Sequence, residues 1–358
     1  MFKHYIDEMS VTGLALKPNL LNSAIKSSSA YDAAILKKLK DDKLGEELVY
    51  ELMLEDLRLA ADLLRPIYDQ TDGVEGWVSL EVSPILTDNT EGILAAVKGL
   101  HTRARRPNFF IKVPGTDAGM PAVEEAIFAG IPINVTLLFS REHYLAAAEA
   151  FLRGIERRIA AGLKPTVCSV ASMSVRHWDA AVRGRVPYAL RNKLSVAVAR
   201  RTYKACCDLL NSSRWQRAYD VGARPQRLLW DGAETPVRGT PDDFYVKNLT
   251  APSTIISLSE CALNALADDG ELSAVLSADG GNCESVLDSF AAAGIDIDAL
   301  ANELQDQEAA SSVTTWIDLM SGIASKSAAL WQLQLGKGAS DDPSVKMKSQ
   351  LKRFRPPK

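Results

Sequence analysis

Two short apolar segments each place one ionisable residue on the face that alternation assigns to the interior of a fold. In residues 76–83 the even-numbered apolar side chains suit a helix layer, so Glu81 faces the opposite side. In residues 108–114 the odd-numbered apolar side chains do the same, which leaves Lys112 pointing inward. A buried lysine is costly unless it is paired or used in chemistry. The sequence therefore predicts an interior carboxylate close to an interior lysine.

Two further segments continue this pattern with uncharged polar residues. In residues 131–138 the odd-numbered positions are apolar, so Asn134 and Thr136 share the inward face. Residues 166–174 place Ser172 near the carboxyl end of the next segment. Active sites of parallel barrels assemble at the carboxyl ends of the strands. We therefore expect a lysine, a carboxylate, an amide and hydroxyl groups in one small volume.

This combination of groups suits Schiff-base chemistry. Burial favours the neutral form of a lysine, and a neutral amine such as that of Lys112 attacks a ketone carbon. Dehydration of the adduct needs proton transfer at the same carbon, a role for Glu81 through a water held by Thr136. Asn134 would orient a substrate hydroxyl, and the imine would be the electron sink, so no metal or other cofactor is needed. The alternative is that Lys112 and Glu81 form a buried structural ion pair.

The elements that must position these residues read as parallel βα units, because short apolar runs alternate with longer helical patterns. The sequence predicts strands at 10–17, 76–83, 108–114, 131–138, 166–174, 226–231 and 253–258. It predicts helices at 46–69, 140–162 and 192–214. We expect a (β/α)8 TIM-type barrel as one domain over 1–335, followed by a basic polar tail at 336–358. A standard first βα unit is not identifiable, because too few residues precede the first predicted strand.

Composition excludes several classes of protein. The formal net charge of -4 at pH 7 offers no basic field for nucleic acid. The five cysteines show no CxxC or Cys/His spacing that would hold zinc. The N-terminal residues include acids where a signal peptide needs an apolar run, and no apolar run is long enough to span a membrane. We expect a cytoplasmic protein without nucleic-acid or membrane partners, and a homo-oligomer is compatible with these features.

Four ordered motifs carry a family resemblance. They are GWVSLEVSP at 76–84, FIKVPGTDAG at 110–119, INVTLLFS at 133–140 and SVAS at 169–172. In this order they resemble the third to sixth strands of the transaldolases, specifically the longer bacterial branch, and the resemblance extends over roughly residues 12 to 330. It implies a class I aldolase-like barrel that transfers or cleaves a three-carbon ketol unit of a sugar phosphate, as in the pentose phosphate pathway.

The resemblance also implies residue roles. By position in the motifs, Lys112 would be the imine-forming lysine, and Glu81 with Thr136 the acid/base and water-holding pair. Asn134 and Ser172 would contact the substrate.

Several positions depart from the family pattern. A first-strand aspartate has no counterpart here, and Asp7 is the nearest candidate. Lys17 stands where the family has a substrate-binding asparagine. His177 stands where an arginine that binds phosphate is expected, and the neighbouring Arg176 would compensate only if the backbone shifts. Alternatively, Arg176 is solvated and His177 is a satisfied polar residue.

The loop after the predicted strand 226–231, which corresponds to the family's seventh strand, is a further departure. The family usually has Trp-Ala-Ser-Thr and a lysine there, whereas residues 231–236 include the acids Asp231 and Glu234. Acids beside a phosphate dianion would repel it, unless they only line a solvated loop. One alternative is therefore a related enzyme for an unphosphorylated carbonyl substrate in a specialised pathway. An alternative of another class is a catalytically impaired barrel that serves as a scaffold or subunit and completes its sheet with a partner.

Overall fold

The seven predicted strands are all present, and they form one parallel sheet in chain order. The computed structural model describes residues 2–233, 240–269 and 275–335. The strands are β1 (Gly13–Ala15), β2 (Trp77–Glu81), β3 (Phe109–Pro114), β4 (Ile133–Leu138), β5 (Ser169–Ser174), β6 (Gln226–Asp231) and β7 (Thr254–Ile256). The two edge strands are shorter than predicted, since each has a partner on one side only within the described residues. The fold is thus a parallel α/β arrangement of the barrel type.

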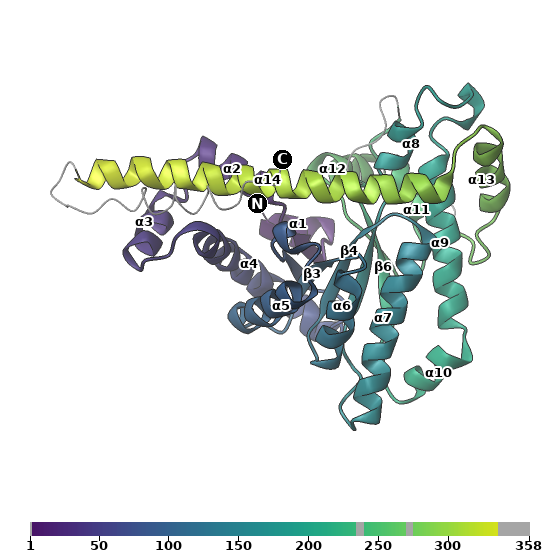
Figure 1. The fold of residues 1–358 in the computed structure, drawn as a ribbon, viewed down its shortest axis with the longest axis horizontal. Coiled ribbons are helices and arrows are strands. Elements are labelled where there is room, and N and C mark those ends of the chain that lie inside the picture. The colour runs from purple at the N-terminus through teal and green to yellow at the C-terminus, as the bar shows by residue number, and fades with distance from the viewer. Residues whose placement is uncertain (1, 234–239, 270–274, 336–358) are drawn as a thin grey trace.

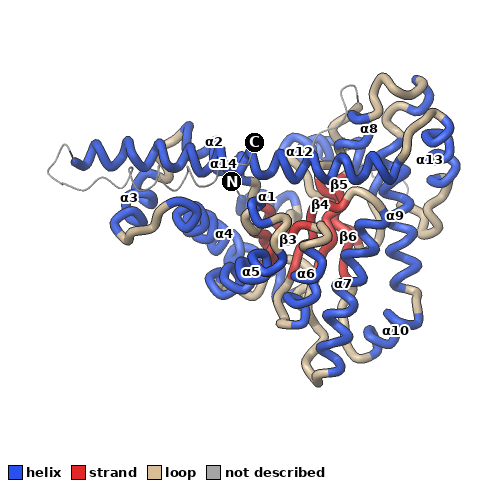
Figure 2. Tube along the Cα trace, in the orientation of Figure 1, coloured by secondary structure: helices blue, strands red, loops and turns tan. Residues whose placement is uncertain are grey.

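Helices surround the sheet (Figures 1 and 2). They are α1 (Phe2–Met9), α2 (Pro18–Ser27), α3 (Asp32–Lys40), α4 (Gly45–Gln70), α5 (Thr90–Ala104), α6 (Gly119–Phe128), α7 (Arg141–Ala160), α8 (His177–Ala181), α9 (Leu194–Leu210), α10 (Ser213–Asp220), α11 (Phe244–Leu249), α12 (Glu260–Asp269), α13 (Cys283–Ala292) and α14 (Ile297–Leu335), with 3-10 turns η1 (Pro84–Leu86) and η2 (Tyr188–Leu190). The helix predicted over 192–214 is divided, because the Ser212 side chain accepts a hydrogen bond from the Trp215 amide and caps a new helix there. In the described part of the chain, no helix is both long and apolar enough to cross a membrane.

The interior of the sheet is layered along the strands. At their amino ends, Trp77 stacks on Phe110 with ring centroids 4.0 Å apart, and Val170 packs with them. Inward positions further along β2 and β3 carry Glu81 and Lys112, which are direct neighbours in the register. The apolar layer closes one end of the interior, so the polar residues face the carboxyl ends of the strands.

The long helix α14 crosses those carboxyl ends, as Figure 1 shows. The Gln305 side-chain amide donates hydrogen bonds to the carbonyl oxygens of Gly115, at 3.0 Å, and Leu137, at 2.7 Å. Further along α14, the Trp316 indole nitrogen donates to Glu46 at 3.0 Å. The helix is therefore anchored on both sides of the sheet opening.

The N-terminal helix α1 connects the two edges of the sheet. It precedes β1, and its Tyr5 hydroxyl donates to the carboxylate of Glu260, the first residue of the helix that follows β7. Phe2 and Ile6 pack against the main hydrophobic core. A helix thus lies between elements adjoining β7 and β1, where an eight-stranded barrel would place another strand. The predicted tail at 336–358 lies outside the described residues.

Candidate active site

A cavity of about 310 Å³ opens at the carboxyl ends of the strands, beneath α14. Five consecutive strands supply its floor and walls. They contribute Glu81 from β2, Lys112 from β3, Thr136 from β4, Ser172 from β5 and Asp231 from β6. Lys17, Arg176 and Glu308 complete the charged lining. The residues predicted from alternation are therefore brought to one place.

Lys112 and Glu81 are neighbours at the bottom of this cavity. The Lys112 side chain is 8% exposed, and no salt bridge joins it to Glu81 among the described residues. Burial raises the pKa of Glu81 above its usual value, and the charges of Asp231 and Glu308 add to this, while Lys112 and Lys17 oppose it. Glu81 therefore keeps its proton to a higher pH than an ordinary glutamate. This suits a group that first donates a proton and later takes it back.

Asn134, Ser172 and Thr136 form the adjoining polar wall. The Ser172 hydroxyl donates to the Asn134 side-chain oxygen at 2.6 Å, and Asn134 pairs with Lys112 in the register. The Thr136 hydroxyl donates to the Val113 carbonyl oxygen at 3.3 Å. Ser172 and Thr136 line the cavity, whereas Asn134 lies just behind it and is 1% exposed. The Ser172 bond therefore fixes the orientation of the amide beside the lysine.

The carboxyl end of β4 has an unusual backbone. The register between β4 and β5 shifts between Val135 and Leu138, and Leu137 adopts a left-handed φ of 59°. This conformation is rare for a residue with a branched apolar side chain. It turns the Leu137 carbonyl toward Gln305, so the α14 contact holds the strained strand end that follows Thr136.

We expect Gln305→Ala to lower the free energy of unfolding by about 1–2 kcal/mol, because two hydrogen bonds to half-exposed carbonyls are lost. Urea unfolding followed by circular dichroism measures this change. Gln307→Ala is the matched control, since the Gln307 amide bonds only to Glu303 on the exposed side of the helix. Equal stability of the Gln305→Ala variant and the wild type would contradict an anchoring role.

The side chains of Arg176 and His177 do not have the orientations that strand alternation predicts. β5 ends at Ser174, and Arg176 already has helical dihedrals of φ -76° and ψ -29° before α8. Alternation therefore no longer applies, and Arg176 reaches the cavity while His177 does not line it. Gly232, with a φ of 78°, permits this, because a Cβ there would lie 3.1 Å from the Arg176 side chain.

Glu308 connects Arg176 and His177 to α14. The His177 Nε2 atom lies 3.0 Å from a Glu308 oxygen and 2.9 Å from Arg176 Nε. The hydrogen bond with His177 lowers the pKa of Glu308, and the charge of Arg176 acts in the same direction. Neither His177 nor Arg176 is simply solvated, and Glu308 is already engaged by both of them.

The three further acids considered from the sequence have different outcomes. Asp7 is exposed on α1 and does not line the cavity, so it is no substitute for a first-strand aspartate. Asp231 does line the cavity, whereas Glu234 lies outside the described residues. Sequence reasoning missed Glu308 and Gln305, because they come from a helix far along the chain. The only available signal was the polar spacing of Glu308, Ser312 and Thr315, which places them on one helix face.

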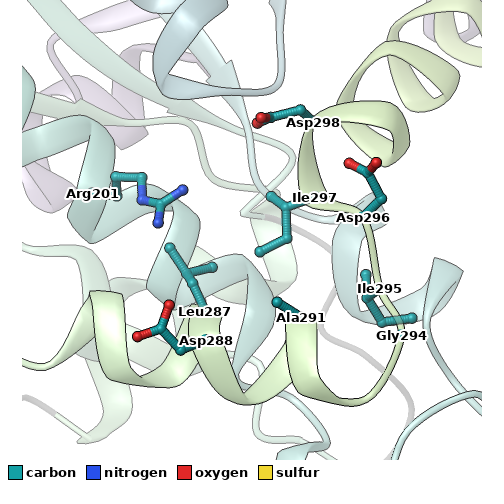
Figure 3. Close-up of a pocket in the computed structure, with 9 residues that line it drawn as sticks. All are labelled: Arg201, Leu287, Asp288, Ala291, Gly294, Ile295, Asp296, Ile297 and Asp298. Atoms are coloured by element: carbon teal, nitrogen blue, oxygen red, sulfur yellow. The ribbon is translucent and has the colours of Figure 1, made fainter.

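A second depression, shown in Figure 3, lies between α9, α13 and the start of α14. It is wider and shallower than the first, and no strand residue lines it. Its one cationic residue, Arg201, is already paired with Glu284 at 3.0 Å. The cavity around Lys112 is therefore the candidate active site.

Comparison with known proteins identifies the family of this chain. Residues 1–323 match the family described as transaldolase/fructose-6-phosphate aldolase. The chain belongs to this family. It is 35% identical over 333 residues to a transaldolase of Thermobifida fusca, with 90% of each chain covered. It is 36% identical over 324 residues to transaldolase 1 of Streptomyces avermitilis, covering 88% of this chain and 85% of that one. The resemblance identified from the strand motifs is confirmed, and the protein is a transaldolase-type enzyme.

Proposed function

We propose that this family member transfers a three-carbon ketol unit of a sugar phosphate through an imine on Lys112. The observation that carries the proposal is the position of Lys112, which is nearly buried at the floor of the cavity without a salt bridge to Glu81. The Lys112 amine at the cavity floor is placed to attack the carbonyl carbon of a substrate that enters the cavity.

The neighbouring residues supply what imine formation requires. Glu81, with its raised pKa, delivers a proton to the hydroxyl of the adduct and takes one back when water returns. Thr136 lines the cavity and would hold the water between Glu81 and the imine carbon. Ser172 and the amide of Asn134 present polar groups to the hydroxyls of the substrate. In this assignment Glu81 and Thr136 act at the imine carbon, and Ser172 and Asn134 act at the substrate hydroxyls.

The charged lining decides how a phosphate would be bound. Besides Lys112 and Glu81, the described lining has the basic residues Lys17 and Arg176 and the acidic residues Asp231 and Glu308. Because the cavity is not strongly basic, we propose that phosphate is held mainly by local contacts with Arg176 and Lys17. The parallel sheet would be the family barrel, with α1 bringing its two edges together.

Substitution tests the phosphate contacts. We expect Lys17→Met and Arg176→Met each to weaken fructose 6-phosphate binding about tenfold, the cost of one charge-assisted hydrogen bond. Isothermal titration measures the affinity, and unphosphorylated fructose is the control ligand because it lacks the group that these residues would contact. If neither substitution weakens the phosphate ester selectively, the substrate is better sought among unphosphorylated carbonyl compounds.

A further inference from the structure

Cleavage of a carbon-carbon bond next to an imine requires a base that imine formation does not use. The hydroxyl on the departing carbon must lose its proton as that carbon becomes an aldehyde. Under the function proposed above, Lys112 is bound in the imine and Glu81 transfers protons at the imine carbon. A separate acceptor is therefore needed on another wall of the cavity.

Among the described residues, three carboxylates line the cavity, and their surroundings differ. The pKa of Glu81 is raised by burial, so it is poorly suited to remain an anionic base. Glu308 is engaged by His177 at 3.0 Å and by Arg176 at 3.9 Å. Asp231 forms no salt bridge with any described residue, and its Oδ1 accepts one hydrogen bond from the Gly232 amide at 2.9 Å. Carboxyl groups in such different surroundings can take different roles in one reaction, one as an acid and another as a base.

Asp231 is also placed on the correct side of the interior. It ends β6, where it pairs with Ser174 of β5. The lysine is on β3, and β4 and β5 lie between the two strands in the sheet. In a sheet that curves around a common interior, strands separated in this way face each other across it. A substrate attached to Lys112 would extend over the cavity toward Asp231.

We propose that Asp231 is the base that removes the hydroxyl proton during carbon-carbon cleavage. The Asp231 carboxylate takes the proton, and the O–H electron pair becomes the second bond of the new aldehyde carbonyl. The electrons of the broken bond form a double bond to the carbon of the protonated imine, and the electron pair of C=N returns to the positively charged Lys112 nitrogen, which becomes a neutral enamine nitrogen. The products are a free aldehyde, an enamine on Lys112 and protonated Asp231. In the transfer step Asp231 returns the proton to the oxygen of the acceptor aldehyde.

The test separates imine formation from bond cleavage. Wild type, Asp231→Asn and Glu308→Gln are mixed with fructose 6-phosphate, reduced with borohydride and analysed by mass spectrometry. The wild type should carry a three-carbon adduct on Lys112, because the aldehyde has left and the enamine, once protonated on carbon, is an imine that borohydride reduces. Asp231→Asn should retain the intact six-carbon phosphate adduct and release glyceraldehyde 3-phosphate roughly 10²- to 10⁴-fold more slowly. Asparagine preserves the acceptor for the Gly232 amide, so the fold should be kept.

Glu308→Gln removes another carboxylate of the same cavity, so it compares the two candidate bases within one site. Asp288→Asn, treated in the same way, is the control that should form the three-carbon adduct, because Asp288 is exposed and lies outside this cavity. Wild-type cleavage by Asp231→Asn, or retention of the six-carbon adduct only by Glu308→Gln, would overturn the assignment. Loss of every adduct in Asp231→Asn would also overturn it, because the residue would then act before cleavage. No adduct even in the wild type would defeat the proposed function itself, and the base assignment with it.

Discussion

Borohydride reduction in the presence of fructose 6-phosphate should leave a covalent adduct on Lys112, because an imine is reducible only while it exists. We expect Lys112→Met to form no adduct and to lose turnover by roughly 10⁴-fold or more, as when a covalent nucleophile is removed from other enzymes. Peptide mass spectrometry locates the adduct, and a coupled assay for glyceraldehyde 3-phosphate measures turnover. The expected loss is large because the reaction proceeds through the covalent imine, and methionine has no amine to form it.

Two other lysines make the experiment specific. Lys98→Met is the control for the substitution itself, since Lys98 is exposed on α5 and outside the cavity, and it should keep both adduct and activity. Among the described lining residues, Lys17 is the other lysine and so the alternative nucleophile for an imine. An adduct on Lys17, or an adduct that persists in Lys112→Met, would show that the imine forms elsewhere. Retained turnover without any adduct would instead favour a mechanism without a covalent intermediate.

The strands and their inward residues were predictable because a strand that is buried on both faces is mostly apolar in sequence. A polar residue among alternating apolar ones, such as Glu81 or Lys112, is conspicuous in such a strand. The register then places these two residues side by side, as expected from neighbouring parallel strands. This part of the site follows from local pattern alone.

The walls of the cavity were less predictable, for two physical reasons. Alternation ends where a strand ends, so Arg176 could not be placed once β5 stopped at Ser174 and the backbone became helical. Contacts across the opening depend on where α14 packs, which local periodicity does not specify. The positions of Glu308 and Gln305 over the strands therefore required the tertiary structure.

We expect Glu81→Gln to fold and to slow imine formation by roughly 10²- to 10⁴-fold, the usual contribution of a positioned acid/base group. Glutamine is nearly isosteric with glutamate, but it can neither give nor accept the proton. The rate of adduct trapping on Lys112 measures the effect directly, because reduction requires the imine. Ser79→Ala is a suitable control, since Ser79 is buried on the same strand but does not line the cavity.

The pH dependence of stability separates this role from a structural ion pair. A carboxyl group whose pKa is raised by folding binds more protons in the folded state than in the unfolded state. Its contribution to stability is present below the unfolded pKa and is lost as the pH rises toward the raised folded pKa. Because burial raises the pKa of Glu81, the wild type should lose stability across this window relative to Glu81→Gln, which does not titrate.

A stabilising ion pair predicts the opposite sign. If the Glu81 carboxylate mainly neutralised Lys112, its folded pKa would be lowered, and wild-type stability would rise with pH relative to Glu81→Gln. The variant would then leave a buried lysine without its counter-charge and should unfold more easily at neutral pH. Urea unfolding of both proteins from pH 4 to pH 8 therefore decides between the two roles. Suppose that Glu81→Gln traps the imine slowly and, at the upper end of this pH range, is at least as stable as the wild type. Glu81 then acts as an acid, because its carboxyl group is needed for proton transfer although its burial lowers the stability of the fold.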